Sequence, residues 1–503
     1  MAYDVDDTWR VLDSRFVIDV VAEDLRLPVN IAFVPDPGTD RKDPFFYVTE
    51  LYGTIKVVSR DGTVKDFVTG LQNYTPPGGI PGAGESGVAG IAVHPDTGDV
   101  YATLMYETGS PDTMIYGKID RFTSIDGGRT AATQTTILDF FPYELWWNSH
   151  QISRLSFGPD GKLYCHVGDG GNPWKAQWLD HFKGKIIRLN PDGSAPTDNP
   201  YYDAADGIDP TDYVYAYGFR NPFGGDWRET DGMLYEVENG MSIDRFAMVT
   251  EGWNYFWGVG EDTDDNMLAF AMYSWDPAHS PVNLAFIQTQ SFCTSGFPED
   301  LHGHAFVTEY GTPWKTGPDV KGKRIVEFSL GTGGPVPAVL SGPTTIVEYI
   351  GSGKATTVAL AAGPDGLYFS DLFDDDNFVD STAGGAKVLR LRPVDPTLLR
   401  LTMGTDTVLW DPLPFATGYD LIRGDLATLR ATGGDYSQAT TNCIAESSTA
   451  SFAVDANVPG SGQGFWYLMR YESASGTACY ESNAVSQYGL RDADVDDSGN
   501  DCQ

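Results

Sequence analysis

His150 and Asp169 are the two residues of this chain whose types and placement best suit proton chemistry. They lie in the stretch WWNSHQISRLSFGPDGKLYCHVGDGG, which begins at Trp146. His150 precedes the apolar segment RLSF, the turn GPDG follows, and Asp169 comes at the end of the next apolar segment. The first strand of an antiparallel hairpin begins where the second ends. We therefore predict that His150 and Asp169 lie side by side at one rim of a hairpin.

A carboxylate beside an imidazole fixes the tautomer of the ring and stabilises the imidazolium that forms when the ring takes up a proton. This arrangement suits a general base, and a purely structural hydrogen bond is the alternative that the residues leave open. His94 and His166 fall inside strand patterns and are expected to pack or to make hydrogen bonds. Trp146 and Trp147 suit either stacking on a sugar ring or packing between sheets.

The hairpin around His150 is one member of a repeat. Each copy has an apolar strand, a turn rich in Pro, Asp or Gly, and a second strand rich in Tyr, Val and Leu. The spacing of about 60 to 70 residues is close to that of propeller blades, and no long amphipathic helix interrupts it. We predict an all-β protein with a six-bladed β-propeller. The copies are NIAFVPDP, GIAVHPDTGDVYATL, RLSFGPDGKLYCHVGD, DWRETDGMLYEVENG, GFPEDLHGHAFVTEYG and LAAGPDGLYFSDLF.

The repeat ends near Pro393, so residues 1–393 are assigned to the propeller. In residues 394–490, Trp410, the proline that follows it and Tyr419 resemble a small fibronectin type III-like β-sandwich, with Trp410 as its buried anchor. Residues 491–503 are interpreted as a solvated acidic tail. A calcium loop at the alternating aspartates of DADVDDSGNDC is the alternative, and no bidentate glutamate follows them.

Charge limits the partners of the chain. There are 70 acidic and 33 basic residues, giving a formal net charge of −37. That field repels nucleic acid and anionic membranes, and no apolar run is long enough for a membrane span. The N-terminus MAYDVDDTWRVLDSRF lacks the features of a signal peptide, although a chain whose leader had been removed would look the same. We expect a secreted or periplasmic protein, and Cys443 with Cys479 is the candidate disulfide if the compartment is oxidising.

Three motifs carry a resemblance to a known family. HQISRLSFGPDGKLYCHVGDGG, KGKIIRLNPDGSAPTDNPYY and YAYGFRNPFG occur in this order, and the similarity extends over roughly residues 27–393. The chain resembles the soluble glucose/sorbosone dehydrogenase family of six-bladed propellers, which use pyrroloquinoline quinone (PQQ) and calcium. The resemblance implies hydride transfer from a sugar or alcohol carbinol carbon to the quinone, followed by an external electron acceptor.

The resemblance also implies residue roles. His150 matches the base that takes the hydroxyl proton, and Asp169 matches the carboxylate that orients it. Arg220 and Asn221 match the pair that contacts the quinone and the reacting oxygen. Glu85 occupies a position, often a glutamine, that contacts the cofactor.

The calcium-binding stretch of the family matches EVENGMSIDRFAMV. There the resemblance implies calcium ligands at Asn239, Gly240 and Asp244, while Arg245 stands where an acid is expected.

The positions of the family's lysine and arginine anchors for the PQQ carboxylates fall near Gly311 and on Thr356 and Val358. Lys315, Lys321 and Lys354 are the nearby lysines in the sequence.

Two alternatives to the quinone-dependent dehydrogenase remain at this point. One is a calcium-dependent hydrolase or lyase that acts on a glycan with the same histidine and aspartate. The other is a non-catalytic protein that binds carbohydrate or a partner through the mouth of the propeller.

Overall fold

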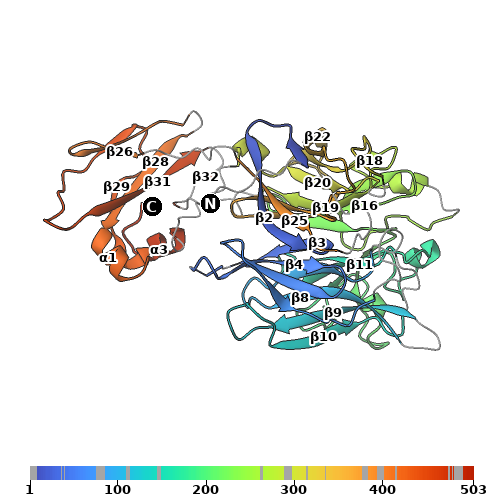
Figure 1. The fold of residues 1–503 in the computed structure, drawn as a ribbon. Coiled ribbons are helices and arrows are strands. Elements are labelled where there is room, and N and C mark those ends of the chain that lie inside the picture. Colours follow the sequence, from blue (N-terminus) through green and yellow to red (C-terminus); the bar gives the residue numbers. More distant parts are fainter. Residues whose placement is uncertain are drawn as a thin grey trace.

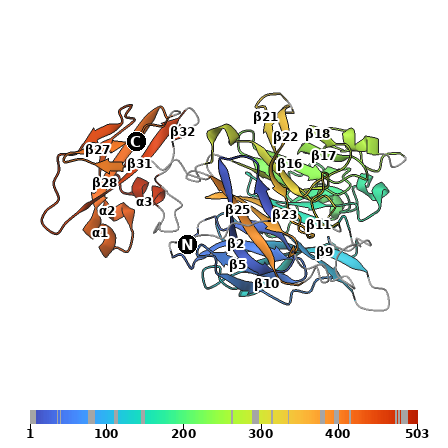
Figure 2. The ribbon, with the colours of Figure 1, turned by 45° about the horizontal axis from the view of Figure 1, so that its top comes forward.

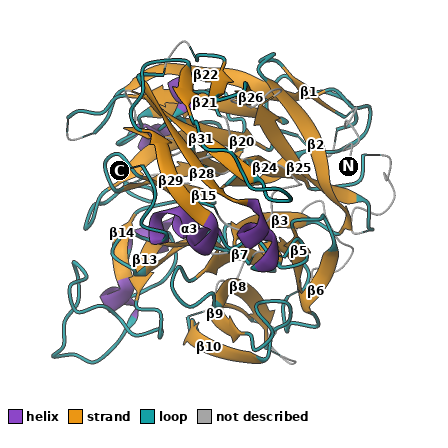
Figure 3. Ribbon diagram, turned by 90° about the vertical axis from the view of Figure 1, so that its left-hand side faces the viewer, coloured by secondary structure: helices purple, strands orange, loops and turns teal. Residues whose placement is uncertain are grey.

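The structure is a computed structural model. It describes residues 8–502 apart from 36, 39, 75–84, 109–113, 144–148, 261–263, 288–296, 313–314, 335, 376–382, 394–400, 414–415, 474–475, 478–479 and 481–490. Strands dominate both parts of the chain (Figure 1). Figure 3 shows that helices are confined to short segments among the strands.

Six antiparallel sheets form the predicted propeller, and each supplies one blade. Blade 1 contains β3 (Pro28–Phe33), β4 (Pro44–Glu50), β5 (Thr54–Ser59) and β6 (Val64–Val68). Blade 2 contains β7 (Val88–Val93), β8 (Val100–Glu107), β9 (Ile115–Thr123) and β10 (Thr133–Asp139). Blade 3 contains β11 (Ile152–Phe157), β12 (Leu163–Val167), β13 (Lys185–Leu189) and β14 (Val214–Tyr217).

The remaining blades use the second half of the propeller and both of its ends. Blade 4 contains β15 (Gly224–Arg228), β16 (Met233–Glu238), β17 (Asp244–Val249) and β18 (Tyr273–Trp275). Blade 5 contains β19 (Pro281–Phe286), β20 (Ala305–Glu309), β21 (Arg324–Leu330), β22 (Val339–Tyr349) and β1 (Trp9–Val11). Blade 6 contains β23 (Thr357–Gly363), β24 (Gly366–Asp371), β25 (Ala386–Pro393) and β2 (Phe16–Leu25).

The ring is closed by pairing the start of the chain with the last propeller strand. β2 runs antiparallel to β25, from Phe16 opposite Pro393 to Leu25 opposite Ala386. Closure removes the exposed sheet edges, and each inner strand packs against the next around the axis. Short 3-10 helices lie in the connections: η1 (Pro173–Gln177), η2 (Pro210–Tyr213), η3 (Asp264–Leu268) and η4 (Glu299–Leu301).

The repeat predicts the inner hairpins of five blades at the correct place, and the fifth hairpin is the exception. Its first strand is β19 (PVNLAF), whereas the pattern was read near Pro298. A long connection separates β19 from β20, and no Pro-Asp or Asp-Gly turn marks it. The turn signal therefore fails for this hairpin, whose connection is much longer than those of the other five.

The C-terminal part contains two sheets (Figure 2). Residues of both sheets share a buried cluster with Trp410. Trp410 is 4% exposed, in the same cluster as Val408, Tyr419 and Leu421, so its predicted place in the core is confirmed. The assignment to fibronectin type III-like sandwiches stays a prediction. One sheet contains β26 (Leu401–Met403), β27 (Thr407–Trp410) and β30 (Phe452–Val454); the other contains β28 (Gly418–Asp425), β29 (Thr440–Ala445), β31 (Phe465–Ser473) and β32 (Gly476–Thr477).

The prediction of a solvated acidic tail is wrong. Residues Asp492–Asp497 form helix α3, Val495 is fully buried, and Asp494 accepts a hydrogen bond from the backbone N–H of Tyr436 at 3.1 Å. Apolar burial and this helix-start contact hold the segment against the sandwich. The other helices here are α1 (Leu426–Ala431) and α2 (Tyr436–Ala439).

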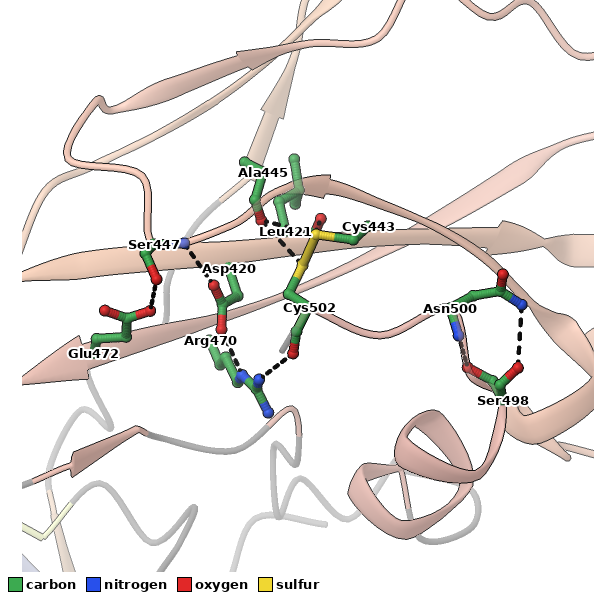
Figure 4. Close-up of a disulfide and its surroundings, with 10 residues drawn as sticks. All are labelled: Asp420, Leu421, Cys443, Ala445, Ser447, Arg470, Glu472, Ser498, Asn500 and Cys502. Carbon is green, nitrogen blue, oxygen red and sulfur yellow. Dashed lines mark hydrogen bonds and ion pairs between the residues drawn. A yellow bond between two sulfur atoms is a disulfide. The ribbon is translucent and has the colours of Figure 1, made fainter.

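The segment that contains α3 and Cys502 also determines which disulfide forms. Cys443 bonds Cys502, with the two Cα atoms 5.1 Å apart (Figure 4). The predicted pairing of Cys443 with Cys479 is therefore wrong, and Cys479 itself lies outside the described residues. Cys165 is a buried free cysteine. In the described part of the chain, no helix combines the length and apolarity that a bilayer crossing requires.

Candidate functional site

The predicted pair is present in blade 3. His150 Nδ1 lies 2.7 Å from Asp169 Oδ1. Ile152 in β11 pairs with Val167 in β12, so the histidine, two residues before the first strand, meets the aspartate, two residues after the second. The side chain of Asp169 is 2% exposed and that of His150 is 16% exposed. A buried carboxylate thus supports an imidazole that solvent still reaches.

Neutral donors hold the Asp169 carboxylate in place. Oδ1 also accepts the backbone N–H of Gly171 at 2.8 Å, and Oδ2 accepts the indole Nε1 of Trp257 at 2.8 Å. The backbone N–H of Asp169 donates to the carbonyl of Arg220 at 2.7 Å. Because an ionised carboxylate only accepts hydrogen bonds, Nδ1 of His150 must carry the proton that it shares with Asp169. Nε2 of the neutral ring is then an acceptor.

Glu85 holds the backbone of the histidine. Its Oε2 accepts the backbone N–H of His150 at 2.5 Å and the side-chain amide of Asn221 at 3.3 Å. His150 has φ +56°, a left-handed conformation that a histidine adopts at some cost. Oδ1 of Asn221 is buried and has no hydrogen-bond partner. The structure therefore brings Glu85, His150 and Asn221 together. The cofactor contacts that the resemblance implies for Glu85 and Asn221 stay a prediction.

Arg220 completes the group. Its guanidinium lies 5.5 Å above the ring of Trp257, and Nη1 donates to the carbonyl of Asn239 at 2.8 Å. The backbone N–H of Arg220 donates to the carboxylate of Glu238. Neither Trp257 nor Glu238 was predicted as a site residue, because both come from blade 4 and no local motif marks them.

The proposed calcium ligands do not fit a calcium ion. The carbonyl of Asn239 is taken by the guanidinium of Arg220, and the carboxylate of Asp244 accepts three backbone N–H groups, from Gly240, His279 and Ser280, at 2.7–2.9 Å. Burial raises the pKa of Asp244 to about 6. Within the described residues, no three His, Cys, Asp or Glu side chains form a metal-binding group.

The guanidinium of Arg245 places a permanent positive charge next to the predicted calcium ligands. Arg245 is completely buried and pairs with Glu238, and its Nε lies 3.8 Å from Glu236. Its Nη1 donates to the carbonyls of Tyr255 and Ala269, each at 2.9 Å. Calcium prefers the same carboxylate and carbonyl oxygens as ligands. Arg245, which stands where the resemblance predicts an acid, therefore supplies to these oxygens the positive charge that a calcium ion would bring.

The anchor positions for the PQQ carboxylates do not fit an anion. Val358 belongs to a buried apolar cluster with Leu27, Val29, Leu51, Phe223, Val282, Leu372 and Phe373. The hydroxyl of Thr356 donates to the carbonyl of Tyr310, and Gly311 has φ +68° with no room for a Cβ. Lys315 and Lys321 are exposed, and Lys354 is partly buried. Burying carboxylates without matched cations is costly. Trp146 and Trp147 lie outside the described residues.

Blade 5 repeats the histidine–carboxylate–tryptophan frame. His279 precedes β19 by two residues, and its Nδ1 lies 3.0 Å from Glu309 Oε2. Trp275 Nε1 donates to Glu309 Oε1 at 2.8 Å. Arg324 is added here, with Nε 2.6 Å from Glu309 Oε2 and Nη2 3.0 Å from His279 Nδ1.

Comparison with known proteins supplies the family. Residues 25–308 match the family Glucose / Sorbosone dehydrogenase, which is more than half of the chain. The chain belongs to this family. The matched region contains His150, Asp169, Glu85, Arg220 and Asn221 and ends before the anchor positions of blade 6.

Individual relatives are more distant. Quinoprotein glucose dehydrogenase B of Acinetobacter calcoaceticus is 30% identical over 217 residues, 38% of this chain and 44% of the relative. Aldose sugar dehydrogenase YliI of Escherichia coli is 25% identical over 251 residues, 48% of this chain and 61% of the relative. The matches therefore span less than two thirds of either relative. An oxidoreductase (glucose dehydrogenase) structure from Thermus thermophilus superposes with TM-score 0.57 and 27% identity, covering 75% of this chain and 99% of that one.

Proposed function

We propose that this protein oxidises the hydroxyl group of a sugar or related alcohol, with His150 as the general base. The hydrogen bond between His150 Nδ1 and the buried carboxylate of Asp169 carries this proposal. It fixes the proton on Nδ1 and leaves Nε2 to take the proton of a carbinol hydroxyl. Family membership and the sugar dehydrogenases among its relatives support the substrate class.

The neighbouring residues have separate roles in this step. Asp169 stabilises the imidazolium that forms, because its charge faces His150 and its other contacts are neutral donors. Arg220 stabilises the negative charge that develops on the substrate oxygen. The unpartnered buried Oδ1 of Asn221 accepts a substrate hydroxyl and orients the sugar.

PQQ is the hydride acceptor that the resemblance implies, and one relative is named a quinoprotein. Bound PQQ would supply an electrophilic quinone carbon. The residues at Gly311, Thr356 and Val358 do not fit its carboxylates, and Asn239 and Asp244 do not fit calcium. We therefore assign only the proton step to this chain's residues and expect weak binding of PQQ.

The electron acceptor and the cellular location are also part of the proposal. We infer an external electron acceptor and a secreted or periplasmic location. The disulfide between Cys443 and Cys502 supports an oxidising compartment, because disulfides rarely persist in a reducing cytoplasm.

The test combines cofactor binding and turnover. The full chain is titrated with PQQ, with and without calcium, and the quinone absorbance is followed; an aldose panel with a redox dye then measures oxidation. Dye reduction that depends on PQQ and is lost in His150→Ala but not in the matched control His279→Ala supports the proposal. Absence of dye reduction in the wild type at saturating PQQ would refute it.

A second candidate is carbohydrate binding without redox chemistry. The apolar cluster around Val358, in place of cofactor anchors, favours it. It predicts that aldoses bind to the wild type and to His150→Ala with equal affinity while neither protein reduces the dye. The calcium-dependent hydrolase or lyase loses its support, because the residues expected to hold calcium are engaged by protein groups.

A further inference from the structure

A cavity lies on the propeller axis, at the end opposite His150. Its volume is about 800 Å³, and all six inner strands contribute to its wall. Strand β11 begins next to His150, and its later part, from Arg154 to Phe157, lines this cavity. With a rise of about 3.3 Å per residue, the two sites lie at different levels of the channel.

Two opposite charges from neighbouring blades, Arg154 and Asp226, lie among the five charged residues that line the cavity. Nη1 of Arg154 donates to Asn30 at 2.9 Å, and its Nε is buried without a partner. Asp226 accepts the backbone N–H groups of Trp227 at 2.9 Å and Phe286 at 3.0 Å. Arg154 and Asp226 interact by charge and share no hydrogen bond, and burial lowers the pKa of the arginine and raises that of the aspartate. Both groups are incompletely compensated by the protein.

Aromatic and aliphatic side chains contribute much of the remaining wall, beside the charged residues Asp96, Arg228 and Glu229. Phe33, Phe157 and Trp227 are each partly exposed and come from blades 1, 3 and 4. The indole Nε1 of Trp227 donates to Ser156 at 3.3 Å, which fixes the ring. The volume is within the range of small-molecule sites, about 300 to 1,000 Å³.

We propose that this cavity binds a neutral sugar. The guanidinium of Arg154 donates and the carboxylate of Asp226 accepts, so together they serve neighbouring hydroxyls of one ring. The aromatic faces cover the apolar C–H surface of that ring. The charges of Arg154 and Asp226 cancel, Arg228 is engaged by protein carbonyls, and Asp96 and Glu229 are exposed acids. The lining and the chain's net charge of −37 therefore both oppose an anion. This site is independent of the proton step at His150.

Calorimetric titration of the full chain with glucose and maltose tests the assignment. Two variants act on the cavity alone: Asp226→Asn removes the charged acceptor at nearly constant shape, and Ala362→Trp fills the cavity from blade 6. We expect each to weaken sugar binding by about tenfold or more, while dye reduction at the His150 site is unchanged. Thermal melting confirms that both variants are folded.

Three results would overturn the proposal. The first is that the wild type binds neither sugar. The second is that folded Ala362→Trp binds sugar with the same affinity as the wild type. The third is that the cavity binds glycine or acetate more tightly than either sugar. Failure of dye reduction alone would count against the proposed oxidation and leave the binding result readable.

Discussion

Blades 3 and 5 contain the same histidine–carboxylate–tryptophan frame at the same end of their inner strands. The two frames differ in one arginine, Arg324, which contacts the frame of blade 5. In blade 3 the carboxylate of Asp169 faces His150 and two neutral N–H groups. In blade 5 the carboxylate of Glu309 is also paired with Arg324. A carboxylate that is already paired with a guanidinium has less charge to offer an imidazolium. The frame in blade 3 is therefore suited to catalysis, and the frame in blade 5 to stability.

Arg324 also competes with Glu309 for the ring nitrogen of His279. His279 Nδ1 lies 3.0 Å from both Glu309 Oε2 and Arg324 Nη2. Because a guanidinium only donates, this nitrogen either donates to the carboxylate or accepts from the guanidinium, and it cannot do both. In blade 3 the carboxylate of Asp169 is the acceptor for Nδ1 of His150, and no guanidinium of the described residues bonds to that nitrogen. Nε2 is therefore fixed as an acceptor in blade 3, whereas in blade 5 its role depends on which partner Nδ1 of His279 takes.

The largest expected difference is in turnover. His150→Ala should lower kcat by about 10²- to 10⁴-fold, the usual contribution of a positioned general base. His279→Ala should leave kcat near the wild-type value. Dye-reduction kinetics with saturating sugar measure both. Equal losses in the two variants would show that the frames are functionally equivalent and that the arginine does not distinguish them.

The carboxylates give the next contrast. Asp169→Asn should lower kcat by about 10- to 100-fold, because the ring loses the group that orients it. Glu309→Gln should leave kcat unchanged but lower the free energy of unfolding by about 1–3 kcal/mol, since Arg324 loses its charged acceptor. Urea unfolding beside steady-state kinetics separates these effects. A loss of stability in Asp169→Asn without loss of kcat would contradict a positioning role for Asp169.

Local register explains which parts of this comparison were predictable from the sequence. His150 and Asp169 are joined by one tight hairpin, so their juxtaposition follows from strand pairing alone. Trp257 and Glu238 reach the site from another blade, and their contacts depend on packing around the ring. His279 was not singled out because the hairpin of blade 5 has a long connection. Cys502 reaches Cys443 only because α3 packs against the sandwich, which no sequence spacing specifies.

A smaller effect concerns the pH dependence of stability. Burial alone would raise the pKa of Glu309, but hydrogen bonds from His279 and Arg324 outweigh it and hold the pKa below its usual value. Its stabilising contribution is thus present above the unfolded pKa of about 4.3 and is lost as the pH falls through the lower folded value.

Arg324→Met tests that explanation, because burial then dominates and protonation of Glu309 favours the folded variant. The difference in Tm between the wild type and Arg324→Met should be largest at neutral pH and should narrow as the pH falls toward 4. Arg324→Lys, which keeps a positive charge, should follow the wild type more closely. A difference in Tm that is constant from pH 7 to pH 4 would rule out Glu309 as the titrating group.

The smallest expected effect is that of calcium on the Tm. It concerns a second arginine, the buried Arg245, which is the counterpart of Arg324 in blade 4. Arg245 pairs with Glu238 as Arg324 pairs with Glu309, so each of these two buried carboxylates already has a cation. A ligand stabilises a protein only if it binds the folded state. EDTA, and calcium added after it, should therefore shift the wild-type Tm by less than about 1 °C. In Arg245→Gln the carboxylates and carbonyls remain without their cation, and there added calcium should raise Tm. A wild-type Tm that falls by several degrees in EDTA would show that an ion, and not the arginine alone, holds this part of the propeller.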